Sequence, residues 1–126
     1  MGLKATAGEW VGVVVSSEGL LDLVARRLRV LGDPVRLRIL AVLQEREATV
    51  TELADGLSTT PQNVSKHLGL LYQAGIVTRH REGSWVRYTL ADYTACRLVE
   101  QAGASVAGFA EELAEAAGLE VAAAQR

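Results

Sequence analysis

Apolar residues recur every three or four positions in several stretches of the chain, which is the spacing of one face of an α-helix. The first stretch covers residues 20–31, and Gly32 predicts the end of that helix. The next stretch reaches about Arg46 and follows Asp33 and Pro34, which suit the cap and the first position of a helix. The pattern therefore predicts two consecutive helices.

Two further helices are predicted close together. Thr49 and Glu52 stand three residues apart, the spacing of a capping box, and predict a helix over residues 50–57. Thr60, followed by a proline, predicts the start of another helix over residues 61–74. About three residues join the two helices. So short a connection is typical of a helix-turn-helix.

After Gly75 the apolar period changes from that of a helix to that of a strand. Residues 76–81 and 85–90 are rich in β-branched and aromatic side chains, and residues 82–84 separate them. They predict a β-hairpin with a glycine-containing turn, placed as a wing after the helix-turn-helix. Residues 91–118 return to helical spacing and predict a last helix.

The expected fold is mainly α with a small β-hairpin wing, a winged helix-turn-helix. A chain of 126 residues is long enough for one such domain with its own core. The expected boundaries are an N-terminal arm (1–17), the domain (18–118) and a flexible tail (119–126). Within the domain they are the helix-turn-helix (about 50–74), the wing (about 76–90) and a C-terminal dimerisation helix (about 91–118).

The composition is that of an ordinary globular domain, with 49% hydrophobic and 22% charged residues, which excludes a wholly disordered chain. The single cysteine, Cys96, excludes an intrachain disulfide and a cysteine-rich zinc site within one chain. No segment approaches the roughly 18–20 apolar residues of a membrane span. We expect a soluble, cytoplasmic protein.

The net charge of −2 hides an asymmetric distribution. Residues 61–90 carry four basic side chains against one acid, whereas residues 100–126 carry five acids against one arginine. Phosphate binding needs a local basic face, whatever the charge of the whole chain. The charge pattern therefore permits nucleic-acid binding through the second helix of the motif and the wing.

The second helix of a helix-turn-helix enters the major groove with its N-terminal residues first. Here the outward positions of its first two turns are polar; Gln and Asn side chains can pair with adenine edges, and Lys66 can neutralise a phosphate. For His67 we expect a phosphate contact or a structural hydrogen bond rather than a metal. The alternative is a polar face that only meets water. The candidate DNA-binding residues are Thr59, Thr60, Gln62, Asn63, Ser65, Lys66 and His67.

The wing supplies the remaining candidate DNA-binding residues, Arg79, Arg81 and Arg87. Strand alternation places the first two on one face, from which arginines can reach the DNA backbone or a narrow minor groove. The alternative is an edge strand whose charges only keep the protein soluble. We interpret Trp85 and Tyr88 as packing residues of the hairpin rather than as platforms for base stacking.

Nothing in the sequence indicates an enzyme or a bound cofactor. We find no Ser/His/Asp set at an interpretable spacing and no glycine loop that would bind phosphate, so we assign no catalytic residues. The two histidines, His67 and His80, both lie in the expected DNA-reading region. The leading hypothesis is a DNA-binding transcription regulator. The alternative is a winged-helix module for protein–protein contacts, which has no operator.

Two segments of the chain resemble the ArsR-type winged helix-turn-helix repressors. They are residues 31–43 (LGDPVRLRILAVL) and 51–90 (TELADGLSTTPQNVSKHLGLLYQAGIVTRHREGSWVRYTL). The elements VSKHL, LxxAGIV and REGxxxxYxL carry the resemblance, which extends over about residues 20–117. It implies a homodimer held by the first and last helices. It also implies a partly palindromic operator, and release of the DNA when an effector binds.

The chain departs from the metal sites of this family. Many relatives sense thiophilic metals through a Cys-x-Cys pair, at positions where this chain has Thr49 and Thr51, and a hydroxyl is a poor ligand for such metals. Other relatives bind metal on the last helix. There the chain keeps Asp92 but has Thr94, Ser105 and Gly108 in place of the other ligands. We therefore expect no metal site.

Cys96 is the one soft ligand left. We interpret it as a small buried residue in a helix interface; the alternative is a metal or redox site shared between two copies. The sequence then favours an organic ligand at the dimer interface, or no effector at all, over the family's metal sites. Small residues permit the last helix to approach another helix closely, and they are Ala95, Ala102, Gly103, Ala104, Ala107, Gly108 and Ala110.

Overall fold

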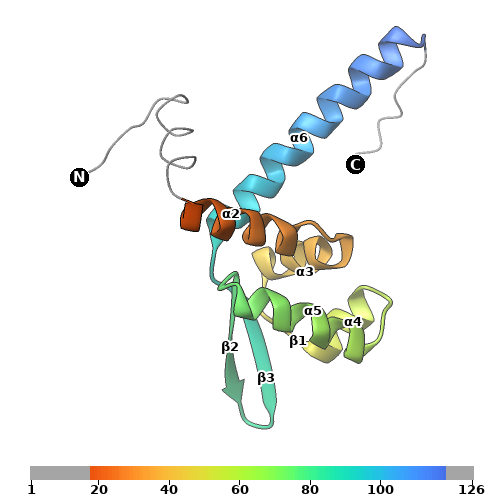
Figure 1. Ribbon diagram of the computed structural model, residues 1–126. Coiled ribbons are helices and arrows are strands. Elements are labelled where there is room, and N and C mark those ends of the chain that lie inside the picture. The colour runs from red at the N-terminus through yellow and green to blue at the C-terminus, as the bar shows by residue number, and fades with distance from the viewer. Residues whose placement is uncertain (1–17, 119–126) are drawn as a thin grey trace.

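The computed structural model describes residues 18–118, so the predicted arm over residues 1–17 and tail over residues 119–126 lie outside the described residues. The elements follow the predicted order (Figure 1). The helices are α2 (Glu18–Leu31), α3 (Pro34–Glu45), α4 (Val50–Gly56), α5 (Pro61–Gln73) and α6 (Tyr93–Ala116). The strands are β1 (Ala48–Thr49), β2 (Val77–Glu82) and β3 (Trp85–Leu90).

The predicted helix starts are confirmed by their side-chain hydrogen bonds. The Asp33 carboxylate accepts from the backbone N–H groups of Val35 and Arg36, at 2.8 and 3.1 Å. Thr49 and Glu52 form the reciprocal capping box at the start of α4. Thr60 caps α5. Each cap of this kind stabilises a helix by about 1 kcal/mol, and together they fix where α3, α4 and α5 begin.

The core lies between α3, α4, α5 and one face of the hairpin. Its central side chains are fully buried, as the close packing of a small domain requires. They come from every one of these elements, so the helix-turn-helix and the wing share one core. The largest of them are Ile39, Leu53, Val64, Leu68, Leu71, Ile76 and Val77.

The sheet differs from the predicted hairpin in two respects. It has three antiparallel strands in the order β1-β3-β2, because Ala48 and Thr49 pair with Tyr88 and Arg87. In addition, the predicted three-residue turn is wrong by one residue: Glu82 pairs with Trp85, and two residues connect the strands. The first of these, Gly83, has a φ of +64°, a left-handed conformation that glycine adopts without strain.

Helix α6 contacts the body of the molecule only with its first turns. Ala95 and Cys96 are buried in the core and Val99 packs against it, whereas the rest of the helix extends away from the body, as Figure 1 shows. No helix among residues 18–118 is long and apolar enough to cross a membrane.

Candidate nucleic-acid interface

Helix α5 places an apolar face in the core and a polar face outside. Val64, Leu68 and Leu71 point inward and are fully buried. Three polar side chains of its first two turns, Gln62, Ser65 and Lys66, are exposed, and they make no hydrogen bond or ion pair with a described residue. Their donors and acceptors are therefore available to a partner.

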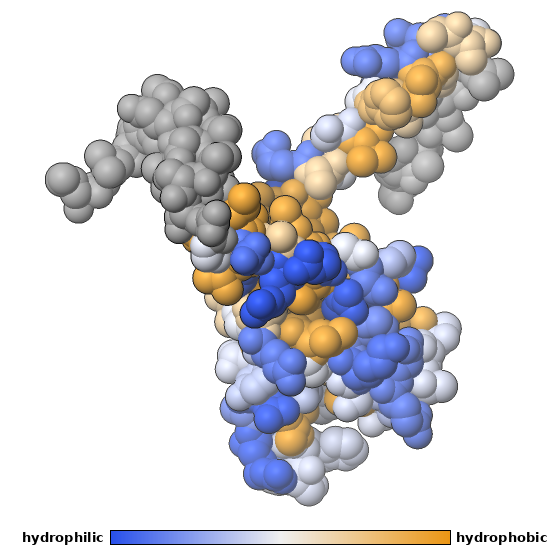
Figure 2. All heavy atoms as spheres, in the orientation of Figure 1, coloured by the Kyte–Doolittle hydropathy of each residue, from blue (hydrophilic) through white to orange (hydrophobic). Residues whose placement is uncertain are grey.

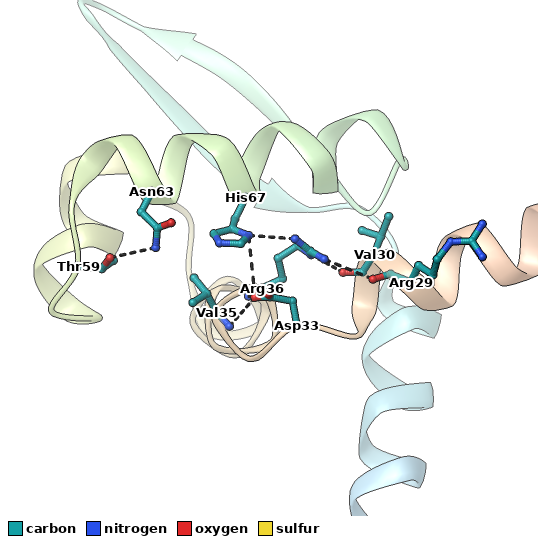
Figure 3. A network of polar contacts seen from close by, with 8 residues as sticks. All are labelled: Arg29, Val30, Asp33, Val35, Arg36, Thr59, Asn63 and His67. Atoms are coloured by element: carbon teal, nitrogen blue, oxygen red, sulfur yellow. Dashed lines mark hydrogen bonds and ion pairs between the residues drawn. The ribbon is translucent and has the colours of Figure 1, made fainter.

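Three other predicted DNA-binding residues use part of their hydrogen-bonding capacity within the protein. The Asn63 side chain is half-buried, and its amide nitrogen donates to the hydroxyl oxygen of Thr59 at 3.1 Å (Figure 3). The Thr60 hydroxyl accepts from the Asn63 backbone N–H, also at 3.1 Å. Thr59 and Thr60 therefore hold the turn and the start of α5, while the side-chain oxygen of Asn63 stays available.

His67 points toward α3 and not toward the polar face of α5 (Figure 3). The residue is only 6% exposed, and its Nδ1 atom lies 3.0 Å from a terminal guanidinium nitrogen of Arg36. This geometry corresponds to the structural hydrogen bond, one of the two roles expected for this residue. It leaves the imidazole little surface for a phosphate, so the geometry favours the structural role of His67 over a DNA contact.

The two strands of the wing divide its arginines between the two faces. Tyr88 is paired with Arg79 and Val86 with Arg81, so these arginines share the face that turns toward the core and α5. Arg79 lies 4.1 Å from the centre of the Tyr72 ring of α5, a cation–π contact. Arg81 is exposed and has no partner among the described residues, so its charge is free to meet a phosphate.

Arg87 lies on the other face of the hairpin, opposite His80. Its guanidinium binds two carboxylates: the Nε atom donates to Glu82 at 3.0 Å, and a terminal nitrogen donates to Glu52 of α4 at 3.5 Å. The hydrogen bond to Glu82, with the charge of Glu52, raises the pKa of Arg87. Arg87 thus links the wing to α4, and these two contacts engage the charge that was expected to meet DNA from this strand.

The two aromatic residues of the wing differ in environment. Tyr88 is buried in the core, as expected for a packing residue. Trp85 is 56% exposed at the end of the hairpin beside the turn, so packing explains only part of its surface. Its ring lies on the face of the hairpin that carries Arg87, opposite to the face of Arg79 and Arg81.

The residues at the family's metal positions have structural roles. Thr49 is buried within the capping box, and Asp92 caps α6 and pairs with Arg27 of α2. Burial in the core raises the pKa of the Cys96 thiol, which favours its protonated form. Across residues 18–118, no three His, Cys, Asp or Glu side chains are grouped so that they could hold a metal ion within one chain.

Comparison with known proteins gives consistent results. A helix-turn-helix domain family matches residues 31–80. The chain is 41% identical over 80 residues to the HTH-type transcriptional repressor SmtB of Mycobacterium tuberculosis, an alignment that covers 64% of this chain and 59% of that protein. The chain thus spans somewhat more than half the length of this relative.

Two solved structures resemble the fold more completely. The crystal structure of M. tuberculosis Rv0081 has a TM-score of 0.68 at 33% identity, covering 76% of this chain and 97% of the other. The homodimeric winged helix-turn-helix DNA-binding domain of Mb0332 from Mycobacterium bovis, a possible ArsR-family regulator, has a TM-score of 0.66 at 30% identity, covering 75% and 87%. By sequence, fold and relatives, the chain belongs to the ArsR-type winged helix-turn-helix transcriptional regulators.

Proposed function

We propose that this chain is a homodimeric repressor that binds duplex DNA with α5 in the major groove and the wing beside it. The observation that carries the proposal is the free polar face of α5, formed by Gln62, Ser65 and Lys66, next to the free charge of Arg81. The amide and the hydroxyl suit base edges, and the two cations suit phosphates.

The dimer is supported by apolar surface that the single chain leaves exposed. A groove of about 590 Å³ lies between α2, the start of α3 and α6, and it is lined by side chains such as Leu28, Leu98 and Val106. Figure 2 shows hydrophobic residues gathered where α6 leaves the body. We assign the groove to the same helices of a second copy, since a two-fold interface pairs one patch with itself.

The two copies would then present their α5 helices to one side of a duplex. Recognition helices of such dimers sit about 34 Å apart, one turn of DNA, and meet two successive major grooves. Binding in this way favours an operator with two related half-sites. Repression follows where such an operator overlaps a promoter.

We further propose that an effector releases the DNA without using the family's metal positions. The contacts at two of these positions support this. The Thr49 hydroxyl already accepts a hydrogen bond from the Glu52 backbone N–H at 3.2 Å. The Asp92 carboxylate forms an ion pair with Arg27 and caps the start of α6. An organic ligand at the dimer interface is the remaining candidate. Release of the protein from DNA by micromolar zinc, nickel or cobalt would overturn this part of the proposal.

The salt dependence of DNA binding tests the function. Each neutralised phosphate contributes about 0.9 to the slope of log affinity against log salt concentration. We expect salt-dependent binding of the full chain to random duplex DNA, and a slope lower by about one for Lys66→Ala. Arg97→Ala, which removes an exposed charge from α6, is the matched control and leaves the slope unchanged. A protein-interaction module would show no salt-dependent binding of duplex DNA.

A further inference from the structure

One guanidinium connects three helices beside the candidate interface. Arg36, in the first turn of α3, donates from Nε to the carbonyl oxygen of Val30 and from a terminal nitrogen to that of Arg29, at 3.3 Å for the latter. Its other terminal nitrogen lies 3.0 Å from His67 Nδ1. Because the last carbonyls of a helix have no partner within the helix, Arg36 completes the end of α2 while it holds α5 (Figure 3).

As a hydrogen bond, the contact between Arg36 and His67 requires one protonation state of the imidazole. A guanidinium only donates hydrogen bonds, so Nδ1 must accept, and the imidazole must be neutral with its proton on Nε2. A protonated imidazole donates from both nitrogens. It could not accept from Arg36 and would be repelled by the positive charge of the guanidinium.

A second partner for the same nitrogen stands nearby. The Asp33 carboxylate lies 3.9 Å from His67 Nδ1, beyond a hydrogen bond but close enough to attract a positive imidazole. The backbone hydrogen bond from Arg36 is the main cause that lowers the pKa of Asp33, so this carboxylate is charged near neutral pH. Protonation of His67 would therefore exchange Arg36 for Asp33 as its partner.

The other elements around α5 supply no competing acid. Within residues 18–118, no carboxylate of α4 or β2 lies within 4.0 Å of the imidazole. Arg79 of β2 lies over Tyr72 instead, and α2 offers backbone carbonyls that Arg36 already occupies. Arg36 and Asp33 are thus the charged groups that decide the state of His67.

We propose that Arg36 is a positioning residue for DNA recognition: through neutral His67 it holds α5 against the end of α2, and protonation of His67 releases that hold. The inference rests on the proposed function of α5. In the proposed dimer α2 contacts the second copy, so the same three residues join the dimer interface to the recognition helix.

The link itself is tested without DNA, by NMR of the full chain during a pH titration. The expected results are an imidazole proton on Nε2 at neutral pH and a His67 titration accompanied by shifts of the backbone amides at residues 29–32. These shifts should vanish in His67→Gln, whose amide oxygen still accepts from Arg36 but does not titrate. They should persist in His80→Gln, which removes the only other histidine. Two results would overturn the link: a proton on Nδ1, or backbone amide signals of residues 29–32 that do not shift when His67 titrates.

The effect on recognition is tested with a duplex enriched by the protein from random DNA, and with a scrambled duplex. The readout is the ratio of the two affinities, because a charged imidazole strengthens binding to any DNA. From about pH 8 to about pH 5.5, which spans the ordinary histidine range, the ratio should fall about threefold to tenfold, the size of one net hydrogen bond. In His67→Gln the affinity ratio should not change with pH. In His80→Gln it should fall with pH as it does in the unchanged protein.

Arg36→Lys provides the second variant. The compact ammonium group of lysine cannot reach Val30, Arg29 and His67 at once, as the planar guanidinium does. The variant should lower the affinity ratio at neutral pH and weaken the pH dependence. An equal pH dependence in the unchanged protein, His67→Gln and Arg36→Lys would overturn the positioning role. If the unchanged protein binds neither duplex, the proposed function fails and the role in recognition fails with it, whereas the NMR titration still decides whether the link exists.

Discussion

At the scale of single residues, the predicted DNA-binding residues of the turn and of α5 divide into two groups. Thr59, Thr60 and His67 use their polar atoms to hold the turn, the helix start and the contact with α3. Gln62 and Lys66 keep theirs free. DNA recognition should therefore depend on the second group directly and on the first group only through the position of the helix.

Gln62→Ala tests the direct role. We expect a loss of about 1–3 kcal/mol in binding to the enriched duplex, with relaxed preference at one base pair, because a side-chain amide can pair with two groups of an adenine edge. Competition binding against all four bases at each position measures both effects. Gln73→Ala, an exposed residue at the end of the same helix, is the matched control. Equal losses on enriched and scrambled duplexes would refute base reading.

Glu52 predicts a pH dependence of stability. The backbone hydrogen bond from Thr49 is the main cause that lowers its pKa below the ordinary 4.5, with the charge of Arg87 as a further cause. The folded pKa lies below the unfolded one, so the carboxylate stabilises the fold above pH 4.5, and this contribution is lost as the pH falls through the folded value.

Urea unfolding of the unchanged protein and Glu52→Gln at a series of pH values measures this contribution. The free energy of unfolding should fall more steeply below pH 4.5 in the unchanged protein than in the variant, which cannot titrate at this position. Asp33 titrates in both proteins and cancels in the comparison. Parallel curves would show that the capping box contributes nothing to acid stability.

At the scale of helices and strands, the elements that the sequence predicts well are those with local signals. Asp33, Thr49 and Thr60 accept hydrogen bonds from residues two or three positions ahead, so a pattern of neighbouring residues is enough to locate them. Strand β1 has only two residues and exists because they pair with Tyr88 and Arg87, about 40 positions away. No local pattern could predict it.

The same distinction separates the predicted site residues that stay free from those that are bonded within the protein. His67 turns toward Arg36, which is 31 positions away in the sequence. Arg87 forms its ion pairs because the register of the hairpin sets it opposite His80 and beside Glu52. The polar face of α5 was predictable from helical spacing, but which of its groups are already bonded depends on the tertiary fold.

The wing arginines should differ in effect. Arg81→Gln should weaken binding to every duplex and lower the salt slope by about one, with unchanged stability. Arg79→Gln should also lower the free energy of unfolding slightly, because it loses the contact with Tyr72. Titrations at several salt concentrations and urea unfolding measure the two effects. Unchanged DNA affinity of Arg81→Gln at physiological salt would show that the wing stays off the DNA.

At the scale of the whole molecule, α6 carries the exposed apolar surface that we propose for the dimer interface. Its apolar side chains Leu98, Val106, Phe109 and Leu113 recur at three- to eight-residue intervals that fall on one side of a helix, and all four are about half exposed or more. Ala95 and Cys96, by contrast, are part of the core. Removing all of residues 91–126 would therefore damage the fold, and a single substitution farther along α6 tests the dimer more cleanly.

Phe109→Glu should convert the dimer to a monomer and weaken operator binding. Phe109 is 61% exposed in the single chain, and burying such a side chain stabilises by about 1.5–3 kcal/mol, counted twice in a two-fold dimer. Analytical ultracentrifugation measures the assembly. Ala104→Glu places the same charge at another exposed position of α6, on the opposite side of the helix, and should remain a dimer. A Phe109→Glu protein that stays dimeric would place the interface elsewhere.

Selection of bound sequences from a random duplex library by the full chain tests dimeric DNA recognition most directly. The expected result is one motif that occurs twice, related by two-fold symmetry, with half-site centres about 34 Å or one turn of the duplex apart. A library that shows no enrichment, or a single motif without symmetry, would contradict a dimer that reads DNA with two copies of α5.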